Sequence, residues 1–300
     1  MTGNVYFYKI GGSCLTGAEA LRNLADIAGS TSKSVFVVSA FEKVTDSLLS
    51  CYNHDRAGIV NHVHDLISLH AGWLTSAIGH YPGDFSLQLL SGSANPHPGK
   101  GEEWNERMLK DEDLPEILSI GERLSAATCT AYLNEIGYKA AFVPSDLLGL
   151  IACRKDARIL PDIQASTSSI RRNVNAILAG HDLLVTTGFF APDTYGKIQT
   201  FCRNSTGLSA VACAGAYGSS HITLSKDVNG IYNVDPKTIS ERAFLYEVLS
   251  HDAAISLATG GSKIVHPAAI ELAKTLSIDI RVRNFVHKST PEGTLITSNY

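Results

Sequence analysis

Short apolar runs and longer amphipathic segments alternate along the first part of the chain. Residues 5–10 form a strand-like run that stops at Gly11 and Gly12. Apolar residues then recur at helical spacing across residues 15–27, and a second β-branched run follows at residues 35–38. A strand, a helix and a second strand in this order make a βαβ unit, so the pattern predicts a parallel sheet.

The remainder of the chain continues the alternation of helices and strands. Residues 45–136 are mostly helical in pattern, with Gly137 as a stop and a loop rich in glycine and proline at residues 91–101. The other predicted elements are strands at 140–143 and 183–187, a hairpin at 189–201, a helix at 209–217, strands at 221–224 and 230–233, a helix at 268–276, a strand at 278–282 and a short strand near Leu295. Neither a repeat nor a linker divides this pattern, so we expect a single α/β domain over residues 1–300 with two lobes.

Composition excludes several classes of function. The net charge is −4 and like charges do not cluster, so the chain lacks the basic patch that nucleic-acid binding requires. No apolar stretch is long enough to span a membrane, and the first residues do not have the pattern of a secretory signal. The six cysteines form no CxxC pair, which is typical of thiols in a reducing cytoplasm. A cytoplasmic protein without nucleic-acid or membrane partners is expected.

The turn after the first strand is a candidate phosphate site. Gly11, Gly12 and Ser13 follow the strand directly, and Lys9 precedes them. Glycines let backbone N–H groups approach an anion closely, and the helix beyond supplies a favourable dipole. Two glycines after a strand are also an ordinary tight turn, and the chain has neither the Walker sequence nor the GxGxxG dinucleotide sequence.

Two other strand ends carry side chains that suit the same chemistry. Hydroxyl groups, including Ser39 and Thr45, follow the second strand, and Lys226 and Asp227 come at the end of a strand late in the chain. In open α/β sheets ligands bind beyond the carboxyl ends of the strands. These segments are therefore expected to converge on one site.

Six segments, taken in order, resemble those of the aspartate kinase family. They are KIGGS at 9–13, VVSAFEKVTD at 37–46, GERLSA at 121–126, VTTGFFAPD at 185–193, SKDVNGIYNVDPK at 225–237 and GGSKIVHPAAI at 260–270. The resemblance implies a three-layer sandwich with a mainly parallel central sheet, the amino-acid-kinase (carbamate-kinase-like) fold. It also implies an acceptor-binding lobe over about residues 1–195 and a nucleotide-binding lobe over about residues 196–300. It ends near Leu295, before the two ACT domains of that family.

The resemblance further implies an ATP-dependent kinase that phosphorylates the carboxylate of aspartate or a closely related small acid. ATP and Mg²⁺ would be the cofactors, without a dedicated set of metal ligands in the protein, and the enzyme would be a homodimer. Lys9 would be catalytic. The implied nucleotide-binding residues are Gly11, Gly12, Ser13, Lys226, Asp227, Tyr232, Lys237 and Lys263. The implied acceptor-binding residues are Ser39, Thr45, Glu122, Arg203, Thr206 and Gly207.

The acceptor loop departs from the family pattern. Where the family has GRGGSD, residues 202–207 read CRNSTG, so Arg203 is kept and Gly207 replaces the acid. Three explanations are open: the acceptor lacks a free α-amine, another acid such as Glu122 replaces the lost one, or catalysis is impaired. The alternative functions are a kinase of the same fold with a different acceptor in a specialised biosynthetic pathway, and a catalytically weak nucleotide-binding subunit.

Two further groups have ordinary structural explanations. Glu122 follows Gly121 at an apparent helix start, where a carboxylate would complement the helix dipole. His62, His64 and Asp65 have the composition of a metal site, but helical residues two apart do not share a face. For His266 a structural role is expected.

Overall fold

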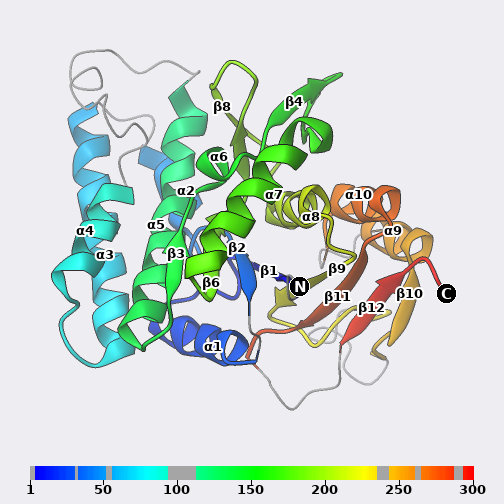
Figure 1. Ribbon diagram of the computed structural model, residues 1–300, viewed down its shortest axis with the longest axis horizontal. Helices are drawn as coiled ribbons and strands as arrows, with labels where there is room; N and C mark the ends of the chain where they lie inside the picture. The colour runs from blue at the N-terminus through cyan, green and yellow to red at the C-terminus, as the bar shows by residue number, and fades with distance from the viewer. Residues whose placement is uncertain are drawn as a thin grey trace.

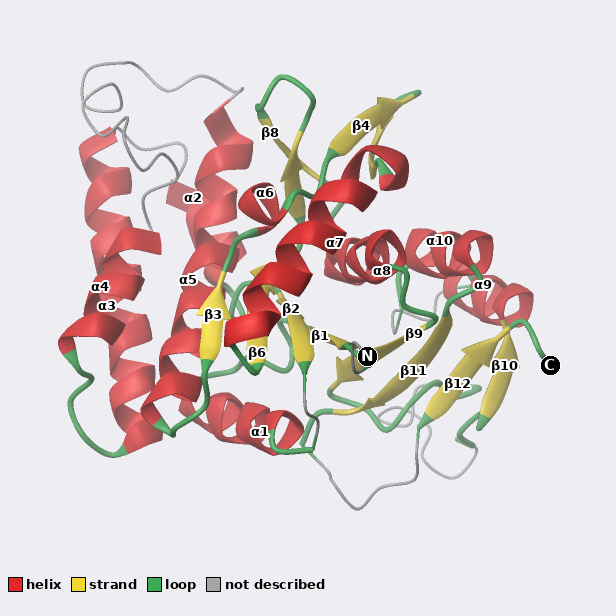
Figure 2. Cartoon of the chain, viewed as in Figure 1, coloured by secondary structure: helices red, strands yellow, loops and turns green. Residues whose placement is uncertain are grey.

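A central eight-stranded sheet organises the computed structural model, with strand order β10-β12-β11-β9-β1-β2-β6-β3 (Figure 2). The structure describes residues 4–30, 33–51, 56–93, 113–234, 243–260, 265–286 and 293–300. The strands are β1 (Tyr6–Ile10), β2 (Ser34–Val38), β3 (Ala140–Phe142), β6 (Leu183–Thr187), β9 (His221–Lys226), β10 (Val248–Ser250), β11 (Asp279–Asn284) and β12 (Thr294–Thr297). Every neighbouring pair is parallel except β11 and β12, which confirms the predicted parallel sheet.

Helices cover both faces of the sheet, giving three layers (Figure 1). One face packs against α1 (Ala18–Ala28), α2 (Val44–Cys51), α3 (Arg56–Ile78), α4 (Asp84–Ser93) and α5 (Leu114–Glu135). The other packs against α6 (Ser145–Leu148), α7 (Ile163–Gly180), α8 (Thr206–Tyr217), α9 (His251–Thr259) and α10 (Pro267–Leu276). Side chains alternate along β2, with Phe36 and Val38 in the first core and Val35 and Val37 in the second. Because both faces are buried, β2 is apolar throughout rather than alternating with polar residues.

Two small hairpins stand outside the central sheet. β4 (Ala152–Lys155) pairs with β5 (Arg158–Pro161), and β7 (Phe190–Pro192) pairs with β8 (Ile198–Thr200). The second is the hairpin expected at residues 189–201. Both rise at the same end of the molecule, above α7 in the view of Figure 1.

Several sequence-based expectations are wrong in detail. Residues 230–233 do not form a strand: Gly230 has φ +155°, and only Tyr232 makes an isolated bridge, to Leu245. The helix expected at 209–217 begins at Thr206. The loop expected at 91–101 starts later, because α4 continues to Ser93, and residues 94–101 lie outside the described part.

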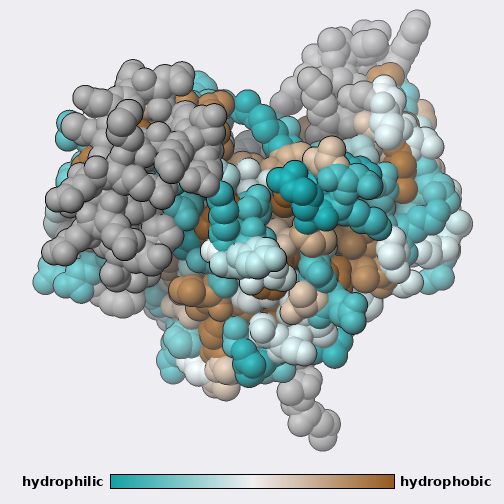
Figure 3. Space-filling view, turned by 90° about the horizontal axis from the view of Figure 1, so that it is seen from above, coloured by the Kyte–Doolittle hydropathy of each residue, from teal (hydrophilic) through white to brown (hydrophobic). Residues whose placement is uncertain are grey.

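No helix among the described residues is long and apolar enough to cross a membrane. On the face seen from above in Figure 3, hydrophilic side chains lie across the middle and hydrophobic ones border them.

Candidate active site

A cavity of about 1160 Å³ lies at the carboxyl ends of four adjacent parallel strands, β9, β1, β2 and β6. Eleven of the residues predicted for the site line it: Lys9, Gly12, Ser13, Ser39, Thr45, Glu122, Arg203, Thr206, Lys226, Asp227 and Tyr232. Gly11 and Gly207 do not line it, and Lys237 and Lys263 lie outside the described residues. The parallel register makes these strand ends neighbours, so segments more than 200 residues apart in sequence meet here.

The turn after β1 has glycines where a side chain would collide, at Gly11, or make a tight contact, at Gly12. A Cβ atom at Gly11 would lie 2.3 Å from the Nζ atom of Lys9, and one at Gly12 would lie 3.1 Å from the carbonyl oxygen of Ala40. Real Cβ atoms are essentially never closer than about 3.0 Å to such neighbours. Gly11 therefore leaves the space that the Lys9 ammonium occupies at the cavity wall.

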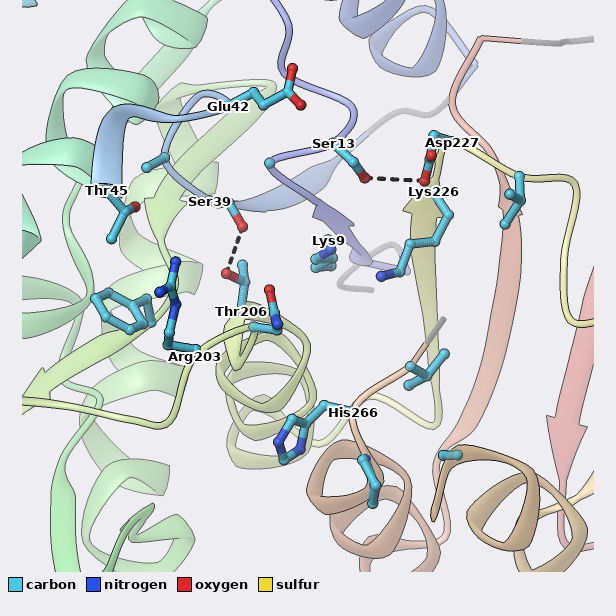
Figure 4. Close-up of a pocket in the computed structure, with 18 of the residues that line it drawn as sticks. Lys9, Ser13, Ser39, Glu42, Thr45, Arg203, Thr206, Lys226, Asp227 and His266 are labelled. Carbon is cyan, nitrogen blue, oxygen red and sulfur yellow. Dashed lines mark hydrogen bonds between the residues drawn. The ribbon is translucent and has the colours of Figure 1, made fainter. Parts of the chain in front are cut away.

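Two lysines from adjacent strands, Lys9 of β1 and Lys226 of β9, lie close together in the cavity. Burial, and then the nearby Lys226 ammonium, lower the pKa of Lys9 from 10.5 to about 7. Burial also lowers the pKa of Lys226. Asp227 is the nearby acid, and its Oδ1 accepts a hydrogen bond of 3.2 Å from the hydroxyl group of Ser13 (Figure 4). A polyanion would relieve the repulsion between the two lysines, so this half of the cavity suits phosphates.

The other half of the cavity is lined by hydroxyl groups and one ion pair. The Ser39 and Thr206 hydroxyl groups are 2.6 Å apart and hydrogen-bonded. The Arg203 guanidinium donates to the Asp46 carboxylate, which lies in the first turn of α2 beside Thr45. In the view of Figure 4 the Ser39–Thr206 pair lies between Arg203 and Lys9. A small anionic acceptor held by Arg203 would therefore face Lys9 across these hydroxyl groups.

Gly188 and Phe189 shape the wall between β6 and α8. A Cβ atom at Gly188 would lie 2.4 Å from Cγ2 of Thr206. Phe189 has φ +69°, a conformation that is strained for an aromatic residue, and its N–H donates to the Ser209 hydroxyl group at 3.0 Å. Phe189 lines the cavity, although the sequence analysis did not identify it. Strain of this kind is concentrated at functional sites, which supports a role for this wall in holding a ligand.

Glu122 lies in the middle of α5, not at a helix start, which excludes the alternative that it complements the helix dipole. Its Oε1 accepts the Ala40 N–H at 3.1 Å, and one turn later the Ser125 hydroxyl group accepts the Phe41 N–H at 2.8 Å. α5 thus holds the loop after β2 at two successive backbone positions. Burial raises the pKa of Glu122 to about 8, and its Oε2 has no hydrogen-bond partner among the described residues.

The buried carboxyl group of Glu122 is expected to make the stability of the ligand-free protein depend on pH. Its pKa is about 8 when folded against an ordinary 4.5, so between these values the folded state keeps a proton that the unfolded state loses. The contribution of Glu122 to the free energy of unfolding therefore falls as the pH rises, opposite in sign to that of buried His70, whose pKa is lowered to about 3 by burial. Glu122→Gln stays neutral and can still accept the Ala40 N–H, so its stability should rise with pH more steeply, or fall less, than that of the wild type.

Urea unfolding of the wild type and of Glu122→Gln at about pH 5 and about pH 6.5 measures the change in the free energy of unfolding with pH. Both pH values lie below the pKa of Lys9, which is about 7. Glu271→Gln, a change at an exposed position of α10, is the control and should leave the wild-type pH dependence unchanged. The same slope with pH in Glu122→Gln as in the wild type would contradict the assignment.

The structure shows where the altered residues of the acceptor loop lie. Asn204 has φ +65° and lines the cavity, so asparagine, a residue that tolerates this conformation, stands where the family has glycine. Gly207 lies in the first turn of α8, where a Cβ atom would face Ala269 of α10 at 3.7 Å. The residue at which the family acid is lost is therefore packed between two helices, outside the cavity lining.

Two of the histidines considered in the sequence make structural contacts, and one of them, His266, also lines the cavity. His266 caps α10, with its Nδ1 accepting the Ala268 N–H at 3.2 Å, as expected, and its Nε2 lies 3.3 Å from the Cys202 sulfur. His62 contacts the Ser47 hydroxyl group through Nε2 at 2.8 Å. Across the described ranges, no three residues of the His, Cys, Asp and Glu types come together as metal ligands would.

Comparison with known proteins identifies related sequences. The model of the amino acid kinase family matches residues 4–284. An aspartokinase of Helicobacter pylori is 31% identical over 190 residues, covering 62% of this chain and 44% of its own length. Aspartokinase 1 of Arabidopsis thaliana chloroplasts is 29% identical over 306 residues, covering 96% of this chain and 51% of its own. The chain thus spans about half the length of these curated relatives.

Solved structures show the same fold. E. coli aspartokinase III in complex with aspartate and ADP superposes with a TM-score of 0.80 at 22% identity, over 98% of this chain and 64% of that one. The UMP kinase of Bacillus anthracis superposes with a TM-score of 0.51 at 15% identity, over 99% of this chain and 96% of that one. The three-layer amino-acid-kinase fold expected from the sequence is therefore confirmed.

Proposed function

Because this chain belongs to the amino acid kinase family, we propose that it transfers the γ-phosphoryl group of ATP to the carboxylate of aspartate or a closely related small acid. The observation that carries the proposal is the single cavity in which a lysine pair lies beside the hydroxyl groups of Ser39 and Thr206 and the Arg203 guanidinium. The aspartokinase relatives, and the neighbour bound to aspartate and ADP, support this choice of acceptor.

The reaction needs positioning and charge stabilisation more than proton transfer. An acceptor carboxylate is already anionic, so its oxygen attacks the γ-phosphorus directly while the bond to the bridging β-phosphate oxygen breaks. The products are an acyl phosphate and ADP. Lys9, held against Gly11, would stabilise the negative charge on the transferring oxygens, and Lys226 would bind the phosphates of the leaving nucleotide.

The nucleotide half would be completed by residues that converge from the turn after β1 and from the end of β9. The N–H groups of Gly11 and Gly12 and the Ser13 hydroxyl group would bind phosphate, and Tyr232 would contact the adenosine. We also propose that Lys237 and Lys263 bind the nucleotide, as the resemblance implies.

Magnesium fits the chemistry of this half. Mg²⁺ is usually held by one or two carboxylates together with substrate phosphates and water, and Asp227, beside Ser13 in the cavity wall, offers one carboxylate. Asp227 would hold the ion, which supplies positive charge that offsets the charge of the triphosphate.

The acceptor half would use Ser39, Thr45, Arg203 and Thr206, with Arg203 binding a carboxylate as a fork of donors. We propose that residues up to about 195 form the acceptor-binding lobe and residues 196–300 the nucleotide-binding lobe, with Arg203 and Thr206 reaching across from the second. The homodimer that the resemblance implies and the cytoplasmic location expected from the composition remain predictions.

An acceptor panel tests the function. ADP release with Mg-ATP is measured for aspartate, N-acetyl-aspartate, malate and succinate, and hydroxylamine traps any acyl phosphate. We expect turnover with aspartate and a hydroxamate product. Turnover with another acid alone would identify a kinase with a different acceptor. Tight ATP binding without turnover of any acid would contradict the proposal and support a nucleotide-binding subunit.

A further inference from the structure

Arg123 is a buried arginine of α5 that does not line the cavity. Its side chain is only 6% exposed. The guanidinium group donates to the Asp146 carboxylate of α6 at 2.9 Å and to the Ser119 hydroxyl group of α5 at 3.3 Å. Its Cζ atom also lies 4.9 Å from the centre of the Phe190 ring, which is the geometry of a cation–π contact. A single side chain thus connects α5, α6 and β7.

The ion pair between Arg123 and Asp146 is not an efficient way to stabilise the fold. Both charges are largely removed from water, and Oδ1 of Asp146 is buried with no hydrogen-bond partner among the described residues. The cost of desolvating two charges commonly cancels their attraction, and apolar residues of similar size often stabilise a fold equally well or better. A role in fixing local geometry therefore explains the pair better than a role in stability.

The hairpin that Arg123 contacts carries two parts of the acceptor half of the cavity. Phe190 begins β7, and the residue before it, Phe189, lines the cavity in a strained conformation that its surroundings must hold. β7 pairs with β8, and the Phe201 N–H donates to the Phe189 carbonyl oxygen at 2.8 Å. Arg203 follows two residues later. The position of the hairpin therefore sets the positions of both Phe189 and Arg203.

α6 holds the same hairpin at the other end of the ion pair. Ser145, the neighbour of Asp146, donates its hydroxyl group to the Phe190 carbonyl oxygen at 2.8 Å. The Ser145 N–H donates to the Thr187 hydroxyl group at the end of β6 at 2.9 Å. In the view of Figure 1, α6 lies below β8 and beside α5. Arg123 thus connects α5 to the hairpin twice, directly through the Phe190 ring and indirectly through Asp146 and α6.

We propose that Arg123 is a positioning residue: by holding the β7–β8 hairpin against α5 and α6, it places Phe189 and Arg203 for the acceptor. The inference rests on the proposed function and adds to it a residue outside the cavity on which use of the acceptor depends. Arg123 contacts α6 and β7, whereas the phosphates of the nucleotide would lie at the ends of β1 and β9. Loss of Arg123 is therefore expected to impair use of the acceptor and to spare nucleotide binding.

The test removes the whole ion pair, because a single substitution would leave one charge buried without a partner. Arg123→Met combined with Asp146→Leu replaces both side chains with apolar ones. We expect the urea midpoint of unfolding to stay close to the wild-type value. We expect kcat/KM for L-aspartate to fall by roughly 10- to 100-fold, since small displacements of positioning groups are costly, and the Kd of Mg-ATP without acid to stay within about 3-fold.

Hydrogen exchange provides a second measure that does not require turnover. The amides of residues 190–203 should exchange faster in the double variant than in the wild type, and those of β1 and β2 should not change. The control combines Lys33→Met with Asp182→Asn, which removes an ion pair at the opposite ends of β2 and β6. It should keep the wild-type kcat/KM and the wild-type exchange of the hairpin.

Wild-type kcat/KM, or wild-type exchange of the hairpin, in the folded double variant would overturn the proposal. So would a parallel loss of Mg-ATP affinity, because it would indicate a general loss of structure. If the double variant does not fold, Arg123→Lys decides: lysine keeps the charge facing Asp146 and loses the planar group that also contacts Ser119 and Phe190. A fall of about 5-fold in kcat/KM for L-aspartate is then expected, and no fall would overturn the proposal.

The two proposals fail in different ways. A wild type that turns over no acid would contradict the proposed function. Exchange of the hairpin amides would still decide whether Arg123 holds the hairpin, because that measurement needs neither acceptor nor nucleotide.

Discussion

Replacing Lys9 with methionine is expected to lower kcat for phosphoryl transfer by about 1000-fold or more, because preorganised charge at the transferring group is a main source of catalysis. Lys9 is buried at the end of β1 and its Nζ lies over Gly11, whereas the other described lysines that line the cavity are Lys226, at the end of β9, and the exposed Lys43. Methionine keeps the length and apolar stem of the side chain and removes only the charge. ADP release with Mg-ATP and aspartate measures the effect.

The fold of this variant is expected to remain intact, and its stability near neutral pH should not fall. The folded state lowers the pKa of Lys9 to about 7, so wild-type stability decreases as the pH falls from 10.5 towards that value. Removing the amine removes this penalty. Lys33→Met is the control, because the Lys33 ammonium donates to the His181 carbonyl group at 2.6 Å, outside the cavity lining. Near-normal turnover in Lys9→Met would contradict the proposed site.

Adding one methyl group at Gly11 is expected to reduce kcat by about 100-fold with little loss of stability. The new Cβ atom would lie 2.3 Å from Nζ of Lys9, and the other nearest atoms are Cε of Lys9 at 3.5 Å and the Ser225 carbonyl oxygen at 3.8 Å. The flexible end of the lysine can move aside at little cost, so the fold tolerates the change. The ammonium, however, leaves the position from which it would contact the phosphate, and a displacement of about 1 Å can cost about 100-fold in rate.

Gly72→Ala is the matched control for Gly11→Ala. Gly72 lies within α3 and a Cβ atom there would meet nothing within 4 Å, so alanine should stabilise the helix by up to about 1 kcal/mol and leave turnover unchanged. Thermal unfolding and kcat are measured for both variants. Full activity in Gly11→Ala, or unfolding at a much lower temperature, would show that Gly11 serves another purpose.

Local sequence signals were sufficient for the strands that build the site. Residues 5–10 and 34–38 are apolar, β-branched or aromatic along most of their length and stop at small or polar residues, which is typical of strands buried on both faces. The expected convergence of their carboxyl ends is found in the parallel register of β1 with β2 and with β9. The sequence also carries a signal for α7, with Asp162 as an N-cap and buried Ile170 and Val174 at helical spacing.

The local sequence predicts secondary structure least well in segments whose conformation depends on tertiary packing. α5 is buried on every side from Ile117 to Leu133, so its apolar and polar residues do not alternate with a helical period, and Glu122 was misplaced at a helix start. Gly230 and Tyr232 lie in a segment that reads as a strand, but the Ile231 N–H donates to the Thr294 hydroxyl group instead of a strand partner. The conformations of these segments are determined by contacts with side chains from distant parts of the chain.

The sequence by itself determined the family and the class of fold, and it predicted the phosphate end of the site, because Lys9, the glycine turn and Lys226 are local features of strand ends. Only the tertiary structure decided which acid contacts Arg203. Gly207, the position that appeared to lack an acid, is packed against α10, whereas Asp46 and Arg203 meet across 157 residues of chain. Contacts of that kind arise when two helices pack on opposite faces of one sheet and their ends meet at its edge, and no local pattern encodes them.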